Sequence, residues 1–549
     1  MKTRKKGIIF FAVVAGIMLS SGVTIAINPA SWFDNSSDPD DSSDPNVTVT
    51  ETGSPLDSYS LEEQPQFCST SEKAKKNAYV QEFKIPTPCT QPLAITVDPH
   101  GSIWFAQTNT GGVTKFNPIT QSFTEYENTI WPEKGRSMMW GIDYSPDGSI
   151  WYTDEASDSI WKFSTLDESY NRIAYPVSEE QSALPQKLTV KGSQIIVNDF
   201  TGSKLTFFTF NQQGEDQYYT TIPSLIDGSV TSDFAIDSEE NIWYTTWIPQ
   251  ETGILIKFDY QSYELSQATS LETQTLFLQD FTNFFQFPDG LSTPNGITVG
   301  PNQKIWIADT SSSFFFSFDP ENEEFTKYVT SPPDNKAYGN STGLIKTPIT
   351  RPYWIEHSDG NLVMNEQTGN RIAVFNPSSE TLVEYNIPSR NPNWADCEGI
   401  DNCGVSQVFD FAIDGKKIWF TEWVENNIGV VDTSIPLDFS ISIDKTNITL
   451  EKGQTVEVTL TANPEGNYAL SDKLISVNLS SSSASMFSDI LINAESNQFI
   501  LNDGEKTIPI QITAGKYALS DTHKVLLGLY DDEVAISQFI NVKIIDPKD

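Results

Sequence analysis

The sequence predicts an all-β protein in which a seven-bladed β-propeller is followed by an immunoglobulin-like β-sandwich, with a signal or anchor helix at the N-terminus. The first observation is a recurring pattern with seven copies: GSIWF at 101, GSIWY at 148, SQIIV at 193, ENIWY at 240, QKIWI at 303, GNLVM at 360 and KKIWF at 416. Intervals of 45 to 63 residues are typical of blades built from four short strands. The second observation is a change of character near Leu437, where the aromatic repeat gives way to short alternating strands such as QTVEVTLTA and KTIPIQITA.

Each repeat unit reads as four consecutive strands. An apolar strand such as PLAITVD comes first, and a tight turn leads to the Ile-Trp strand; two alternating segments such as VTKFNP and SFTEYE follow. The seventh unit ends after NIGVVDTSIP without a fourth strand. Residues 78–88, AYVQEFKIPTP, match TLVEYNIPSRN of the sixth unit, so we expect them to complete the last blade and close the ring.

These patterns divide the chain into four parts. Residues 1–27 begin with four basic residues and continue as an uncharged apolar stretch, which fits either a cleaved signal peptide or a transmembrane anchor. Residues 28–75 are predicted to be an acidic disordered stalk, residues 76–436 the propeller, and residues 437–549 the sandwich. Under both interpretations of the N-terminus, the rest of the chain is extracytoplasmic, held at the cell surface or secreted.

The composition excludes some classes of function. Asp and Glu number 73 against 34 Lys and Arg, which gives a formal charge of −39 and argues against a nucleic-acid partner. Three His and four Cys leave few ligands for zinc or copper, so the metals to consider are the oxygen-bound ions Ca²⁺ and Mg²⁺.

The cysteines and sequons fit an exported chain. The short CEGIDNC loop favours a Cys397–Cys403 disulfide, which leaves Cys68 to pair with Cys89. Glycosylation sequons occur at Asn35, Asn46, Asn340, Asn447 and Asn478.

Two segments of the repeat carry a family resemblance. IWFTEWVENNIGVVD, residues 418–432, resembles the blades of the streptogramin B lyases, and TPNGITVGPNQKIWIADT, residues 293–310, is similar to gluconolactonase-type blades. NHL-type propellers share the same signature, and the resemblance covers residues 78–436. It implies a seven-bladed propeller, but it does not by itself imply catalysis, because related propellers without enzymatic activity carry the same blades.

Alignment of the units predicts two rings of residues at one face of the propeller, here called the mouth. The start of each first strand gives Leu93, Trp140, Gln186, Ser232, Asn295, Tyr353 and Phe409, and the end of each second strand gives Gln107, Asp154, Asp199, Thr246, Asp309, Glu366 and Glu422. Of these, Trp140, Gln186, Asn295 and Tyr353 are predicted to bind a ligand, together with Trp394 in a nearby loop. Asp154, Asp199 and Asp309 are candidate ligands of Ca²⁺ or Mg²⁺. The gluconolactonase resemblance implies Asn295, in the PNG motif, as a further ligand of such an ion. The alternative is that the acidic ring bonds to neighbouring backbone.

The lyase resemblance implies histidines at the first ring, and this sequence has none there. Tyr353 of RPYWI stands where the family pattern carries a histidine, and His100, His357 and His523 are expected to solvate turns or lie in the sandwich. A lyase mechanism would therefore need a carboxylate whose pKa is raised, and Glu422, Glu366 and Tyr353 are the catalytic candidates.

Three long insertions are predicted to join blades on the mouth face, at residues 271–292, 331–347 and 389–404. The first contains Phe281, Phe284, Phe285 and Phe287, which are expected to form an aromatic rim with Trp394 and Tyr353.

Three functional hypotheses follow. The first is an extracellular binding or scaffold module for a small molecule, glycan or protein, attached to the membrane through the N-terminal anchor. The second is a metal-dependent lyase or lactonase acting on a cyclic ester. The third is a purely structural envelope component without a small ligand.

Overall fold

The computed structural model describes residues 55–547, apart from 133–134, 177–182, 211–216, 224–225, 227, 250, 252, 270–277, 341–347, 466–472, 484–488 and 502–503. The predicted signal or anchor at 1–27 lies outside the described residues, as do the sequons at Asn35 and Asn46. Within the described part, no helix is long and apolar enough to cross a membrane.

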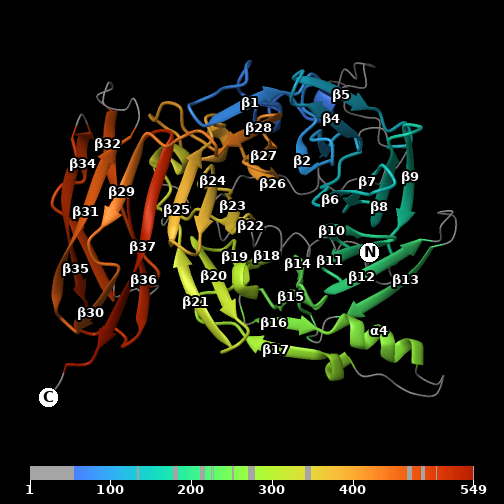
Figure 1. Cartoon of the computed structure of the whole chain (residues 1–549). Coiled ribbons are helices and arrows are strands. Elements are labelled where there is room, and N and C mark those ends of the chain that lie inside the picture. Colours follow the sequence, from blue (N-terminus) through green and yellow to red (C-terminus); the bar gives the residue numbers. More distant parts are fainter. Residues whose placement is uncertain are drawn as a thin grey trace.

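Seven four-stranded antiparallel blades form a ring (Figure 1). Blade one contains β2 (Pro92–Val97), β3 (Ile103–Gln107), β4 (Val113–Asn117) and β5 (Ser122–Tyr126), and blade two contains β6 (Ile142–Tyr144), β7 (Ser149–Asp154), β8 (Ser159–Ser164) and β9 (Ser169–Ala174). Blade three contains β10 (Pro185–Lys191), β11 (Gln194–Asp199), β12 (Lys204–Phe210) and β13 (Gln217–Pro223). Blade four contains β14 (Phe234–Ile236), β15 (Ile242–Trp247), β16 (Gly253–Phe258) and β17 (Thr282–Gln286). The next two are β18 (Pro294–Val299), β19 (Ile305–Asp309), β20 (Phe314–Asp319) and β21 (Glu324–Val329), then β22 (Pro352–Ser358), β23 (Asn361–Glu366), β24 (Arg371–Asn376) and β25 (Thr381–Asn386). The predicted β-propeller is confirmed.

The last blade joins two distant parts of the chain. It contains β26 (Val408–Asp414), β27 (Lys417–Glu422) and β28 (Asn427–Asp432), and its outer strand is β1 (Val80–Lys84). Val80 lies opposite Val431 and Lys84 opposite Asn427 in this antiparallel pair. The pairing gives β28 a neighbour, so the seventh blade does not end in a three-stranded sheet with an open edge.

The repeated tryptophan explains why the units share one pattern. Trp104 of blade one lies 6.1 Å from Phe163 of blade two, and Trp306 of blade five lies 5.6 Å from Phe375 of blade six. Both tryptophans are almost fully buried. In five of the seven blades, one tryptophan ring of the second strand therefore fills the space between neighbouring blades, which is why the Ile-Trp pattern recurs. Blades three and six carry Ile196 and Val363 at this position instead.

The C-terminal part is a two-layer β-sandwich. One layer holds β30 (Asn447–Glu451), β37 (Val534–Ile545), β36 (Thr522–Tyr530), β32 (Lys473–Ser481) and β34 (Gln498–Leu501); the other holds β29 (Phe439–Ile443), β31 (Thr455–Pro464), β35 (Lys506–Ala514) and β33 (Ile490–Ala494). Val458 and Ile510 of one layer share a core with Leu527 and Val542 of the other.

The sandwich and the propeller share one sheet. Strand β25, at the outside of blade six, pairs with β37, and the register runs from Thr381 opposite Gln538 to Tyr385 opposite Val534. Figure 1 shows these two strands side by side where the two parts meet. The pairing covers an edge that would otherwise be open, so the sandwich is a fixed extension of blade six.

Residues 55–75 differ from the predicted disordered stalk. They contain the 3₁₀ helix η1 (Pro55–Ser58) and the helical turn α3 (Gln64–Phe67), and Tyr59 and Phe67 are buried. The prediction rested on the acidic and Ser-rich composition, which overlooked two aromatic rings and a cysteine that attach this segment to the propeller. We call residues 55–68 the cover segment.

The first long insertion also lies elsewhere than predicted. Phe284 and Phe285 are in β17, the fourth strand of blade four, and the inserted residues precede this strand as α4 (Tyr260–Thr269) and η2 (Leu278–Phe281). Phe285 packs on Trp243 and Phe318, whereas Phe284 is half exposed. The predicted rim is therefore wrong for these residues, because TNFFQ supplies the outer strand of the blade.

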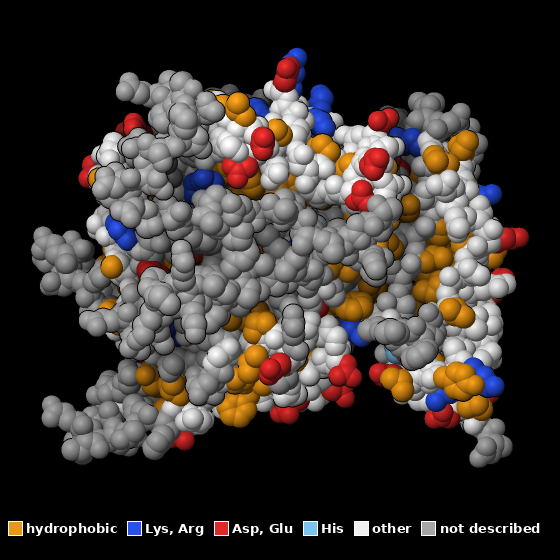
Figure 2. All heavy atoms as spheres, turned by 180° about the vertical axis from the view of Figure 1, so that it is seen from behind, with side chains coloured by type: hydrophobic (Ala, Val, Ile, Leu, Met, Phe, Trp, Pro, Cys, Tyr) orange, Lys and Arg blue, Asp and Glu red, His pale blue; other side chains and the backbone are white. Residues whose placement is uncertain are grey.

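The remaining short helices are η3 (Pro301–Gln303), α5 (Asn335–Tyr338) and η4 (Pro392–Trp394). The second and third insertions connect blades as predicted, and they carry α5 and η4. Seen from behind, acidic side chains are spread over several parts of the surface among fewer Lys and Arg (Figure 2).

Candidate functional site

The candidate site is the mouth of the propeller, where the first strands begin. In blades one, three, five, six and seven, the register between the first and second strands shifts at this end. Such an irregularity turns a side chain out of the regular ladder. At two of these positions a side chain takes the place of the missing backbone hydrogen bond between the strands. The Asn198 side chain accepts from the Lys187 amide at 2.6 Å, and the Asn365 side chain accepts from the Trp354 amide at 2.8 Å.

Three aromatic residues predicted at the mouth lie together. Trp140 stacks on Tyr353, with ring centres 6.0 Å apart and an interplanar angle of 14°. Phe409 meets Trp140 edge-on at 5.5 Å and Tyr353 at 6.1 Å. Tyr353 and Phe409 are buried and Trp140 is half-buried, so the rings pack on one another as well as lining the mouth.

The cover segment lies over these residues. Phe67 stacks on Tyr59 at 4.9 Å and meets Trp394 and Trp423 edge-on at 5.9 and 5.7 Å. The indole of Trp394 donates to the carbonyl of Gln66 at 2.8 Å. Tyr59, Phe67, Trp394, Trp423 and Phe409 belong to one buried apolar cluster, to which Trp140 is packed.

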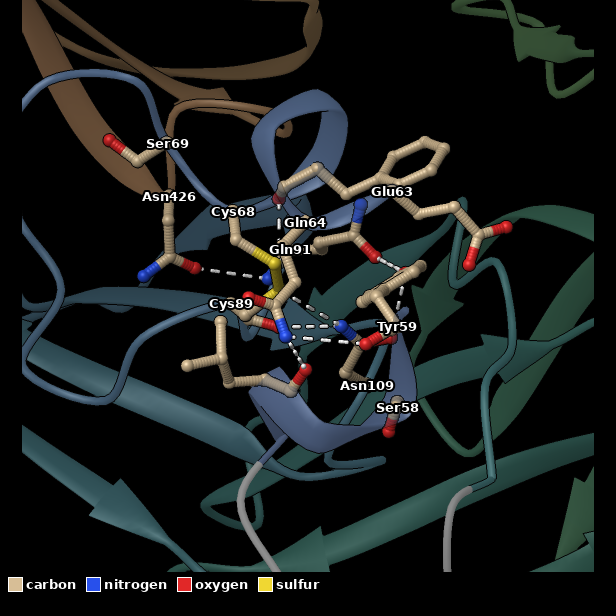
Figure 3. Close-up of a disulfide and its surroundings, with 12 residues drawn as sticks. Ser58, Tyr59, Glu63, Gln64, Cys68, Ser69, Cys89, Gln91, Asn109 and Asn426 are labelled. Carbon is tan, nitrogen blue, oxygen red and sulfur yellow. Dashed lines mark hydrogen bonds between the residues drawn. A yellow bond between two sulfur atoms is a disulfide. The ribbon is translucent and has the colours of Figure 1, made fainter. Parts of the chain in front are cut away.

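Polar contacts hold the cover segment as well (Figure 3). The Tyr59 hydroxyl donates to Gln91 and lies 3.2 Å from the Asn109 side-chain oxygen. Arg136 places its guanidinium 4.3 Å from the centre of the Tyr59 ring and donates to the Ser58 carbonyl at 2.6 Å. Cation–π geometry of this kind adds to the area buried by the ring.

Both predicted disulfides are confirmed: Cys68 is bonded to Cys89, and Cys397 to Cys403. Figure 3 shows the first one at the end of the cover segment, next to Asn109, whose side chain donates to the Cys89 carbonyl. The disulfide therefore ties the cover segment covalently to the chain just before blade one.

Removing this disulfide is expected to cost more than removing the other. The Cys68–Cys89 bond closes a loop of 21 residues and the Cys397–Cys403 bond a loop of 6. Loop entropy in the unfolded chain then predicts losses of about 3 and about 2 kcal/mol, respectively. We expect Cys68→Ser/Cys89→Ser to lower the urea midpoint more than Cys397→Ser/Cys403→Ser, and the reverse order would contradict the assignment of a docked, native-like cover segment.

The predicted acidic ring is bonded within its own blades. Asp154 accepts from Ser137 at 2.5 Å and from the Trp161 indole at 2.9 Å. Asp199 accepts from the Leu184 amide at 2.8 Å, and Asp309 from the Thr293 amide at 2.7 Å. The contacts of Asp199 and Asp309 correspond to the backbone-bonding alternative, and Asp154 also accepts from the Ser157 amide at 3.2 Å.

The catalytic candidates Glu366 and Glu422 are also bonded to partners within the protein. Arg371 lies 2.7 Å from Glu366, and the Asn427 side chain donates to Glu422 at 2.7 Å. Burial raises the pKa of both carboxyl groups well above the usual value; the Arg371 charge opposes this shift at Glu366, whereas the neighbouring Glu82 raises the pKa of Glu422 further.

The predicted metal ligands do not form a cluster. Asn295 is buried, and its side-chain oxygen has no hydrogen-bond donor among the described residues. However, the described part of the chain contains no group of three or more His, Cys, Asp or Glu that could hold a metal ion. Asp154, Asp199 and Asp309 sit in three different blades with partners of their own, so these residues do not fit a carboxylate-held Ca²⁺ or Mg²⁺.

Two histidines lie in strands rather than turns. His357 is in β22 and His523 is in β36, and His100 lies in a turn. Burial lowers the pKa of His523.

The sequence alignment missed Glu155, which follows the end of β7. Its carboxylate accepts from the Trp140 indole at 2.7 Å. Burial raises the pKa of Glu155 to about 7, opposed by the bond from Trp140 and assisted by the charge of Asp154. The carboxylate thus combines a hydrogen bond from Trp140, which stacks on Tyr353, with a pKa near neutrality.

The protonation of Glu155 predicts a pH dependence of stability. Its pKa is higher in the folded state than the ordinary 4.5, so the folded state binds the proton more tightly and stability falls as the pH rises from about 4.5 to about 7. Glu155→Gln keeps the acceptor oxygen without a charge. We expect its melting temperature to exceed that of the wild type at pH 8 but not at pH 5, whereas Glu324→Gln on the surface shifts both alike. Equal differences at both pH values would contradict this assignment.

The central channel also holds charges that sequence reasoning missed. Lys187, Asp233 and Asp410 follow the mouth positions by one residue, and Asp143 and Glu356 by three. Lys187 lies 3.2 Å from Asp410, and its ammonium group is 4.5 Å from the centre of the Trp354 ring. Burial raises the pKa of Glu356 to about 7 and that of Asp233 to about 6, although Lys187 opposes both shifts.

A signal for these residues was present in the sequence. The residue that follows the mouth residue is uncharged in four blades (Ala94, Gly141, Gly296 and Trp354). It is charged in the other three (Lys187, Asp233 and Asp410). Strand periodicity directs alternate residues to the same face, so this register predicts a charged layer in the channel.

No protein-family model matches the chain, and no curated protein matches it. Similar solved structures include a catalytically inactive virginiamycin B lyase from Staphylococcus aureus with quinupristin, 20% identical, with a TM-score of 0.47, covering 66% of this chain and 99% of that one. A streptogramin B lyase is 17% identical over 64% of this chain and 96% of its own, with a TM-score of 0.47. A nidogen/laminin complex gives 14% identity and a TM-score of 0.33 over 50% of this chain and 89% of that one.

The strand topology defines the class of this protein as a seven-bladed β-propeller. The similar solved structures include the streptogramin B lyase-like propellers that the repeat resembles.

Proposed function

We propose that this chain is an exported binding and scaffold protein whose propeller is a rigid platform with a closed mouth. The single observation that carries the proposal is the cover segment, which buries Phe67 and Tyr59 over the mouth and is tied there by the Cys68–Cys89 disulfide. A ligand or substrate approaching this face would meet the cover segment before Trp140, which packs on the same cluster, and Tyr353 stacked on it.

The proposed export is supported by the disulfides, since such bonds persist in oxidising compartments. Attachment to a membrane through residues 1–27, and the immunoglobulin-like character of the sandwich, belong to the same proposal. Among the sequons in the described part, Asn340 and Asn447 are exposed. Asn478 is buried and donates to Ser537 at 3.0 Å, so a glycan is proposed at the first two positions only.

The second candidate is a lyase or lactonase, and one observation favours it. Glu155 has a pKa of about 7 and adjoins Trp140 beside Tyr353, as a general base for a substrate in the mouth would require. Under this alternative the cover segment would have to leave before a substrate enters.

Turnover assays distinguish the two. The full chain, Cys68→Ser/Cys89→Ser and Glu155→Gln would be incubated with cyclic depsipeptides and lactones, and ring opening followed by mass spectrometry. The scaffold proposal predicts no turnover by any of the three. Turnover that rises when the disulfide is removed and disappears in Glu155→Gln would overturn it in favour of the enzyme.

A further inference from the structure

A second candidate site lies where the propeller meets the sandwich. A cleft of about 1050 Å³ is bounded by residues 331–338 after blade five, by β24 and β25, and by β32, β34 and the 530–533 turn of the sandwich. This volume is slightly above the range of about 300 to 1,000 Å³ that is typical of small-molecule sites. Neither the mouth nor the channel contributes to it.

The walls of the cleft are fixed to one another. Strand β25 pairs with β37, so blade six and one sandwich layer form one sheet beside the cleft. Asn478 on β32 donates to Ser331 of the loop and to Ser537 of β37. The amide of Ser331 in turn donates to Glu384 at 3.0 Å. A preformed cleft of this kind loses little conformational entropy when a ligand binds.

The charged groups that line the cleft are already paired. Lys336 lies 2.8 Å from Asp532, and Lys473 lies 3.5 and 3.4 Å from Asp531 and Glu533. Arg371 pairs with Glu366, and Asp334 accepts from the Lys336 amide at the start of α5. Because each charge has a partner within the protein, a charged ligand would have to displace an existing ion pair or, at Asp334, a hydrogen bond.

Neutral polar groups remain available. The hydroxyls of Tyr338 and Tyr530 and the side chains of Asn335 and Asn497 make no side-chain hydrogen bond that the described residues supply, and all four line the cleft. Leu474 adds an apolar surface, since 56% of it is exposed. These groups match a ligand whose faces are apolar and whose edges carry hydroxyl groups. The phenol rings and the apolar patch suit its faces, and the phenol hydroxyls and amides suit its edges.

We infer that this cleft binds a neutral oligosaccharide, with pyranose faces against Tyr338, Tyr530 and Leu474 and hydroxyl groups bonded to Asn335 and Asn497. The inference rests on the proposed binding function and gives it a site and a class of ligand. Burial, together with Asp334 and Tyr530, raises the pKa of Tyr338, which keeps its phenol protonated as a hydrogen-bond donor.

Calorimetric titration of the full chain with neutral hexasaccharides (cellohexaose, chitohexaose, maltohexaose and mannohexaose) tests the inference, with hexagalacturonate as the acidic comparison. We expect at least one neutral hexasaccharide to bind, and Tyr338→Ala/Tyr530→Ala to weaken it at least tenfold. Tyr530→Phe is the milder variant and Tyr517→Ala, an exposed tyrosine outside the cleft, the matched control. Melting temperatures establish that the variants fold.

Binding of the acidic hexasaccharide alone, binding that the Tyr338 and Tyr530 substitutions leave unchanged, or no binding by any of the four neutral hexasaccharides would overturn the inference. A different result would count against the closed mouth. In that case Trp140→Ala/Tyr353→Ala would abolish hexasaccharide binding, whereas the Tyr338 and Tyr530 variants would still bind. Turnover of cyclic esters would count against the scaffold function independently of the cleft.

Discussion

Arg371→Ala is expected to lower the free energy of unfolding by about 3 to 5 kcal/mol, because it leaves two buried carboxylates without their counter-ion. Arg371 is only 5% exposed; it lies 2.7 Å from Glu366 and 3.7 Å from Glu384. It also donates to the Ser331 carbonyl at 2.8 Å. The guanidinium therefore balances the charge of these two glutamates in blade six and holds the loop between blades five and six.

Urea titration followed by tryptophan fluorescence would measure this loss. Arg172→Ala is the matched control, since Arg172 lies on the exposed outer strand of blade two and donates to Ser159 at 2.8 Å. Arg371→Met combined with Glu366→Gln and Glu384→Gln removes all three charges and should recover much of the stability. If Arg371→Ala behaves like Arg172→Ala, the buried charge network assigned here is incorrect.

Phe67→Ala is expected to release the cover segment without unfolding the propeller. Truncation of a buried phenylalanine costs about 3 to 5 kcal/mol, and Phe67 contacts Tyr59, Trp394 and Trp423. A loss of 3 kcal/mol raises the population of the undocked segment about 100-fold.

Chymotrypsin cleavage after Tyr59 under native conditions reports this population, because Tyr59 is buried while the segment is docked. Leu61→Ala is the control within the same segment, since Leu61 is 84% exposed. We expect the cleavage rate to rise about 100-fold in Phe67→Ala and to stay near the wild-type rate in Leu61→Ala. Equal rates in all three proteins would show that Phe67 does not hold the segment.

The propeller could be predicted from the sequence because each blade repeats the same physical requirement. In five of the seven blades one tryptophan of the second strand fills the gap to the next blade, so the period is marked directly by Trp104, Trp151, Trp243, Trp306 and Trp419. Cysteine spacing likewise predicted both disulfides, because a loop as short as that from Cys397 to Cys403 favours local pairing.

The contacts of the mouth could not be predicted in the same way. Alignment placed Trp140, Tyr353 and Phe409 near one another, but nothing local in the sequence shows that Phe67 packs over them. The cover segment has an acidic and polar composition, and its order depends on two aromatic rings and a disulfide to Cys89, which lies 21 positions later in the turn between β1 and β2. Composition describes the average of a segment, whereas docking depends on a few residues in it.

The junction of propeller and sandwich could not be predicted from the sequence for a related reason. The β25 segment TLVEYN alternates like the other outer strands, yet Glu384 within it is fully buried because β37 and the Ser331 loop cover it. Pairing between strands about 150 residues apart leaves no local mark, so both the shared sheet and the cleft beside it required the structure.

The closed mouth is the central claim, and hydrogen exchange of the full chain tests it most directly. The amide of Cys68 donates to Gln64 at 2.8 Å and that of Ser69 donates to Val424 of blade seven at 2.9 Å. If the cover segment is docked, a peptide spanning residues 64–69 exchanges as slowly as peptides from β26 and β27. Exchange of that peptide at the rate of an unstructured chain, while β26 and β27 stay protected, would contradict the closed mouth.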